Sequence, residues 1–78
     1  MKYIDILYTV ADNAGVPTTQ IGQKLGMSRE YVATMKSKQN IPRIDTAAKL
    51  LGVCDYVLCA LPSDRVPSDA LVVSDGIE

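Results

Sequence analysis

The chain contains no histidine, tryptophan or phenylalanine, and its four aromatic residues are all tyrosines. Without histidine it lacks the side chain most often used as a general base near neutral pH. We also find no glycine-rich phosphate loop and no cluster of carboxylates at metal-ligand spacing. The sequence therefore predicts a protein that is not an enzyme and that uses no metal ion, cofactor or small-molecule ligand.

Cysteine is scarce as well, with only Cys54 and Cys59 present. A metal site needs more ligands and a redox pair needs a two-residue gap, so we expect two buried, reduced thiols on one helix. The stretch after Met1 is interrupted by Asp5 and Asp12 and so matches neither a signal peptide nor a membrane span. These features predict a cytoplasmic protein without a membrane partner.

The net charge of −1 is unevenly distributed along the chain. Between Val16 and Leu50, six basic residues minus two acidic ones give +4, whereas between Pro62 and Glu78 one basic residue minus four acidic ones gives −3. A basic central segment suits contact with phosphates, although a solvated face has the same composition.

Hydrophobic periodicity predicts an all-α fold, a compact bundle of about five short helices in residues 1–61 followed by an acidic tail in residues 62–78. The expected helices are Lys2–Ala14, Thr18–Leu25, Arg29–Ser37, Ile44–Leu51 closed by Gly52, and a fifth that starts after Cys54 and runs to Pro62. A chain of 78 residues buries only a marginal core, so we expect it to form a homodimer.

A spaced pattern of apolar and small residues runs through the segment from Thr18 to Ser37, and it consists of Ile21, Gly22, Leu25, Gly26, Met27, Val32 and Met35. Two short helices that cross steeply need a small residue at the crossing and a residue that tolerates positive φ at the corner. Gly22 and Gly26 occupy these two places. The apolar positions are expected to point inward, which leaves the outer face of the second helix free.

This pattern resembles the helix-turn-helix of the phage-repressor and Cro-type family, over about Tyr3 to Leu61. The resemblance implies a sequence-specific transcriptional regulator from a phage or integrated element, which binds double-stranded DNA as a homodimer on a palindromic operator. It implies base readout by Ser28, Arg29, Glu30 and Thr34. Phosphate contacts are expected from Thr18, Thr19, Lys36, Lys38 and Arg43.

Individual positions in this pattern differ in their chemistry. Arg29 suits a bidentate contact to guanine. Ser28 is expected to cap the helix Arg29–Ser37. Glu30 either accepts a hydrogen bond from cytosine, caps the same helix or orients Arg29. The chain departs from the family at Thr18, where glutamine is usual, and at Lys38, where many relatives carry glycine. The segment from Pro42 to Gly52 is also shorter than the common pattern.

The predicted fifth helix is apolar on nearly all sides and must therefore be covered by a partner. This places Tyr56, Val57, Ala60 and Leu61 in a dimer interface. In the tail, the β-prone run Ala70–Val73 either pairs with the same run of a second subunit, through Leu71 and Val73, or stays a loop. The alternative function is a repressor-like protein-interaction module, such as an antitoxin, an antirepressor or an anti-restriction factor, that does not read DNA.

Overall fold

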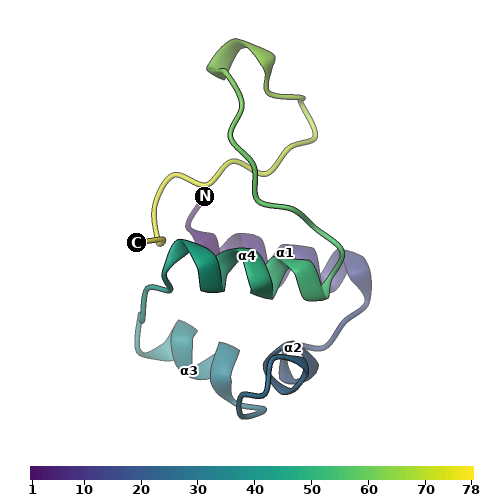
Figure 1. Cartoon of the computed structure of the whole chain (residues 1–78), viewed down its shortest axis with the longest axis vertical. Coiled ribbons are helices and arrows are strands. Elements are labelled where there is room, and N and C mark those ends of the chain that lie inside the picture. Colours follow the sequence, from purple (N-terminus) through teal and green to yellow (C-terminus); the bar gives the residue numbers. More distant parts are fainter.

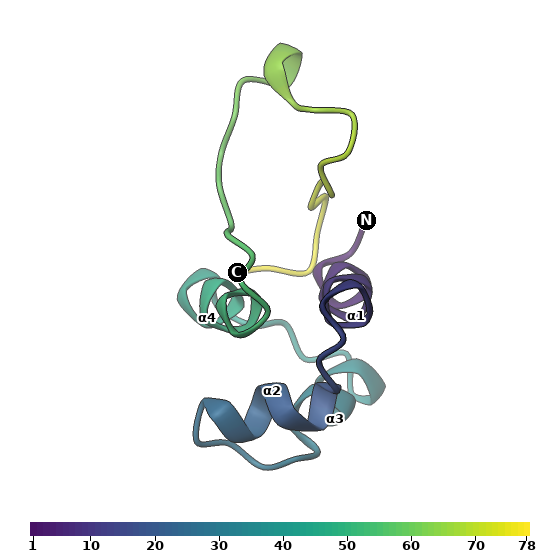
Figure 2. The same cartoon turned by 90° about the vertical axis from the view of Figure 1, so that its right-hand side faces the viewer.

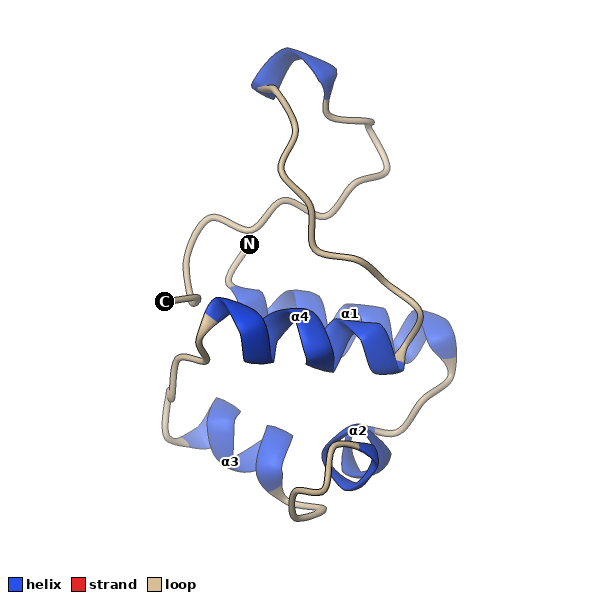
Figure 3. Cartoon of the chain, viewed as in Figure 1, coloured by secondary structure: helices blue, strands red, loops and turns tan.

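Four α-helices form the body of the protein, and a long extended segment rises from it (Figure 1). The computed structural model describes residues 1–78. The helices are α1 (Tyr3–Ala14), α2 (Thr18–Lys24), α3 (Tyr31–Ser37) and α4 (Ile44–Val53), followed by the single 3-10 turn η1 (Ser63–Arg65). The structure contains no strand, as Figure 3 shows, so the prediction of an all-α fold is confirmed.

The helices lie in two layers, with α1 and α4 side by side and α2 and α3 beneath them (Figures 1 and 2). The core between them is almost entirely aliphatic, and its members are Tyr3, Ile6, Leu7, Val10, Ala11, Ile21, Val32, Met35, Ala47, Leu50, Leu51 and Cys54. In α1 these residues recur at the three- and four-residue spacing of an amphipathic helix. None of the helices is both long and apolar enough to cross a membrane.

Glycine ends α1, as its position predicts. Gly15 has φ of 68° and donates its N–H to Asp12, while the next N–H, of Val16, bonds back to Ala11. These bonds satisfy carbonyl groups that the helix end leaves free. The chain can therefore turn directly towards α2.

The fifth helix is a wrong prediction. Gly52 lies inside α4, which continues to Val53, and Asp55 then adopts φ of 63°. The N–H of Asp55 bonds to the carbonyl of Gly52, and that of Tyr56 bonds to the carbonyl of Leu51, which is the Schellman pattern of a helix end. With its last carbonyls satisfied and a left-handed residue at the corner, the helix cannot continue.

After this corner, residues Tyr56–Val73 form an extended arm that carries η1 at its tip (Figure 1). We call this segment the arm. It points away from α2 and α3 along the longest axis of the molecule (Figures 1 and 2). The run Ala70–Val73 lies in the returning half of the arm and forms no strand.

The last residues of the chain return to the body instead of forming a loose tail. Ser74 bonds to Met1, and Asp75 accepts a hydrogen bond from the backbone N–H of Tyr3. Glu78 then pairs with the segment before α4, because its N–H bonds to Pro42 and its carbonyl accepts from Ile44. These residues join the start of α1 to the start of α4.

Candidate nucleic-acid interface

The turn between α2 and α3 brings two backbones into direct contact. A Cβ atom placed on Gly22 would collide with the carbonyl oxygen of Ser28 and lie 3.3 Å from the Cβ of Tyr31. Gly26 forms the corner with φ of 75°. Figure 1 looks along α2 and shows α3 from the side, whereas Figure 2 shows α2 from the side. The two helices therefore cross steeply. The two predicted glycine roles are both confirmed.

Buried side chains hold α3 against the rest of the body. Val32 is fully buried and Met35 is only 4% exposed, while Leu25 is half-buried beside them. Met27 departs from the prediction, because its side chain is exposed. It follows the left-handed corner at Gly26, which turns it outward rather than towards the core. The opposite side of α3, which includes Ala33, Lys36 and Ser37, faces solvent.

The predicted base-reading residues lie at the start of α3, but the helix begins later than predicted. It starts at Tyr31, so Ser28, Arg29 and Glu30 form a tight turn before it, and Thr34 lies half-buried within it. Ser28 does not cap the helix with its hydroxyl; its backbone carbonyl instead accepts from the N–H of Tyr31 at 3.2 Å. The three turn residues are all exposed.

Arg29 and Glu30 do not pair with each other. The structure contains a single ion pair, between Arg43 and Asp45 at 3.6 Å. The suggestion that Glu30 orients Arg29 is therefore not supported, and Glu30 makes no side-chain cap either. The Arg29 guanidinium is an exposed group whose donors carry no acidic partner from the protein.

The predicted phosphate contacts are in different surroundings. Thr18 and Thr19 are the first residues of α2, and Lys38 lies exposed at the C-terminal end of α3. Lys36 leans over the ring of Tyr8, with its Nζ 4.3 Å from the ring centre, a cation–π contact that the sequence did not suggest. Its side chain is thereby directed towards α1.

Arg43 is the predicted phosphate contact that the structure supports least. Besides its ion pair with Asp45, it lies between Pro42 and Ile44, the two residues that bond to Glu78. The acidic end of the chain thus returns to the edge of the basic segment, and the two charge regions are not fully separate. The contact of Glu78 with the segment around Arg43 joins residues far apart in sequence, so no local sequence pattern predicts it.

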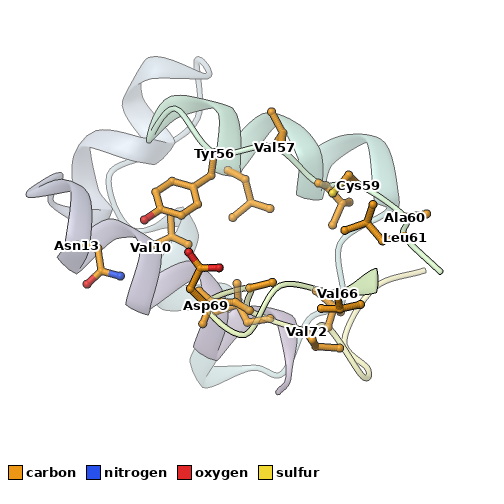
Figure 4. Close-up of a pocket in the computed structure, with 16 residues that line it drawn as sticks. Val10, Asn13, Tyr56, Val57, Cys59, Ala60, Leu61, Val66, Asp69 and Val72 are labelled. Carbon is orange, nitrogen blue, oxygen red and sulfur yellow. The ribbon is translucent and has the colours of Figure 1, made fainter. Parts of the chain in front are cut away.

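The predicted dimer residues meet at the other end of the molecule. Tyr56, Val57, Ala60, Leu61, Leu71 and Val73 all line one open cavity of about 500 Å³ between the arm and the helices α1 and α4. Figure 4 shows Tyr56 and Leu61 on one side of this cavity and Val66, Asp69 and Val72 on the other. The structure gathers these residues although the helix expected to carry four of them does not form.

The two cysteines differ in their surroundings. Cys54 is buried at the end of α4, whereas Cys59 is exposed in the arm, so the prediction of two buried thiols on one helix is wrong for Cys59. Burial raises the pKa of the Cys54 thiol, and nearby Asp55 adds to this while Lys24 opposes it. No three His, Cys, Asp or Glu side chains lie close enough together to hold a metal ion.

A comparison of the chain with protein-family models, curated proteins and solved structures finds no match.

Proposed function

We propose that this protein is a sequence-specific, double-stranded DNA-binding regulator of transcription in which α2 and α3 form a helix-turn-helix. The observation that carries the proposal is the backbone contact of Gly22 with Ser28. It fixes a steep crossing while Val32 and Met35 hold α3 from behind. An α-helix with its side chains is about 10–12 Å wide and fits a major groove of about 12 Å. The exposed face of α3 is then free to enter that groove.

In this proposal Arg29 reads a base. It is exposed, lacks an ion-pair partner and lies in the turn that leads into α3, where it would meet the groove first. Its planar fork matches the O6 and N7 acceptors of guanine. Ser28, Glu30 and Thr34 are close to it in sequence and would complete the reading surface. Glu30 has no cation to neutralise it and would accept from a cytosine amino group.

Phosphates would be held on both sides of this surface. Thr18 and Thr19 place hydroxyl groups and backbone N–H groups at the start of α2, and Lys38 ends α3. Lys36 adds a positive charge in the last turn of α3, beside the ring of Tyr8, and would contact a phosphate there. Such contacts fix the orientation of the protein on the duplex but carry little sequence information.

The regulator would act as a homodimer on a palindromic operator, with half-sites about one helical turn, ~34 Å, apart. It would control a promoter by occupying it.

The test is selection of bound sites from random duplexes with the purified protein, followed by a salt titration on the selected duplex. If a dimer contacts six to eight phosphates, the logarithm of affinity should fall with the logarithm of salt concentration at a slope of about −5 to −7. The control is a scrambled duplex of equal length, which should bind at least a thousandfold more weakly at physiological salt, the lower end of the ~10³–10⁷ range. A protein-interaction module would select no sequence and show no duplex affinity to titrate.

A further inference from the structure

The extended first half of the arm has a backbone without partners. No N–H of Val57–Leu61 donates a hydrogen bond and no carbonyl of this run accepts one. None of the five residues is charged. Extended, apolar segments with free backbone groups are surfaces that associate with another chain.

Alternation along this run separates two faces. In an extended chain every second side chain points to the same side. Leu58 packs against the core of its own body. Val57, Cys59 and Leu61 occupy the alternate positions, and Val57 is 82% exposed while Leu61 is 49% exposed. All three residues line the open cavity beside the arm and remain exposed, so the arm presents a stripe of three apolar side chains that a second chain can reach.

The molecule exposes more surface to solvent than a compact protein of the same mass does. A compact protein of 8.4 kDa exposes roughly 4600 Å², whereas this chain exposes 5290 Å². The excess of about 700 Å² is close to the ~800 Å² that each partner buries in a standard interface. Six of the ten exposed large apolar residues lie in the arm, so exposed apolar side chains are concentrated there.

We infer that the occupant of this face is a second copy of the chain, with the two arms packed along a shared two-fold axis that runs parallel to them. Each stripe residue then meets its own counterpart: Val57 on Val57, Cys59 on Cys59 and Leu61 on Leu61. Because the stripe is uncharged, this self-pairing brings no like charges together. An unrelated protein would have to supply a matching uncharged stripe, whereas a second copy already has one.

The direction of the two-fold axis rests on the proposed function, because binding to one duplex requires both α3 helices at the same end of the dimer. The arm follows the longest axis of the molecule and points away from α3 (Figures 1 and 2). Rotation about an axis parallel to the arm keeps both α3 helices at the same end. The shorter extents are 24 and 18 Å, so two copies side by side are wide enough to hold two α3 helices ~34 Å apart. A two-fold axis across the arms would instead point the two α3 helices in opposite directions.

The first experiment measures the oligomeric state of the full chain by sedimentation without DNA. We expect a dimer, and Val57→Asp should weaken it about a hundredfold or more because each dimer would bury two carboxylates. Ile41→Asp is the matched control, since Ile41 is 52% exposed but lies outside the arm, and it should stay dimeric. A monomeric wild type, or a Val57→Asp variant that dimerises normally, would overturn the inference.

The second experiment determines the direction of the axis with a short bis-maleimide cross-linker. In a Cys59→Ser background, Val57→Cys and Leu61→Cys should each cross-link to themselves, and Cys59→Ser alone should give no cross-link because Cys54 is buried. If instead only a mixture of the Val57→Cys and Leu61→Cys chains cross-links, the axis runs across the arms and the inference is wrong. Neither measurement involves DNA, so a dimer that binds no duplex would refute the proposed function and leave this inference standing. A monomer that selects a DNA sequence would refute this inference and the homodimer, but not base reading by the start of α3.

Discussion

The hydroxyl of Tyr3, in the first turn of α1, donates a hydrogen bond of 2.7 Å to the backbone carbonyl of Ala47 in α4. Tyr3 is fully buried, and its backbone N–H bonds to Asp75 near the end of the chain. One residue thus connects the two long helices and the returning terminus. The upper layer, on which α2 and α3 pack, depends on this connection.

Tyr3→Phe should lower the free energy of unfolding by about 1 kcal/mol, the usual net value of one hydrogen bond, because the ring still fills its place in the core. Urea denaturation followed by circular dichroism would measure the change. Tyr56→Phe is the control, because Tyr56 is exposed and its hydroxyl has no hydrogen-bond partner, and it should stay within about 0.5 kcal/mol of the wild type. Equal effects in the two variants would contradict a special role for the Tyr3 hydroxyl.

The same hydroxyl makes stability sensitive to alkaline pH. Burial, with smaller effects of Tyr31 and Cys54, raises the pKa of Tyr3 above its ordinary value near 10. Above pH ~10 the unfolded chain releases this proton while the folded chain keeps it, so stability is complete below that pH and falls as pH rises further. Burial also raises the pKa of Cys54. Because a cysteine thiol ordinarily loses its proton at a lower pH than a tyrosine hydroxyl, the loss of stability due to Cys54 begins below pH ~10. Urea midpoints between pH 8 and 11 should fall less steeply for Tyr3→Phe than for the wild type above pH ~10; parallel curves would exclude Tyr3 as a source.

Two helical glycines provide a matched test of the crossing between α2 and α3. Gly22→Ala should destabilise the fold by about 1–3 kcal/mol, because the new methyl group meets the Ser28 backbone, which can yield only if α3 shifts. Gly52→Ala should stabilise it by about 0.5–1 kcal/mol, because nothing lies within 4 Å of its added methyl and alanine favours the helix. Thermal and urea unfolding of both variants would check the opposite signs. A neutral Gly22→Ala would mean that the two backbones do not meet closely in solution.

What the sequence revealed about the fold was local. The starts of α2 and α4, the end of α1 and the roles of Gly22 and Gly26 follow from spacing and from glycine. The missing fifth helix could not be foreseen, because Asp55 takes the left-handed conformation without being glycine. Gln39 does the same after α3, one position beyond Lys38.

What the sequence missed in the candidate site depends on contacts distant along the chain. The exposure of Ser28, Arg29 and Glu30 was predictable from the apolar positions around them. The place of Glu78 beside Arg43 and of Lys36 over Tyr8 was not, since these pairs are far apart in sequence and follow no repeat. The residues predicted for the dimer interface were chosen by their apolar character alone, which does not depend on whether the segment is helical or extended.

Substitutions at Arg29 test whether the proposed protein reads a base there or is only attracted to the charge of DNA. Arg29→Lys keeps the charge but loses the planar fork, so affinity for the selected duplex should fall roughly five- to 150-fold, the equivalent of about 1–3 kcal/mol. Affinity for a scrambled duplex should stay nearly unchanged, because the phosphate attraction remains. Lys38→Ala is the contrasting variant: it removes an exposed charge outside the reading surface, so it should weaken both duplexes alike and reduce the salt slope by about one. Fluorescence anisotropy over a range of salt concentrations would measure all four affinities. If Arg29→Lys weakened both duplexes equally, Arg29 would be a phosphate contact, and base reading would have to come from Glu30 and Thr34.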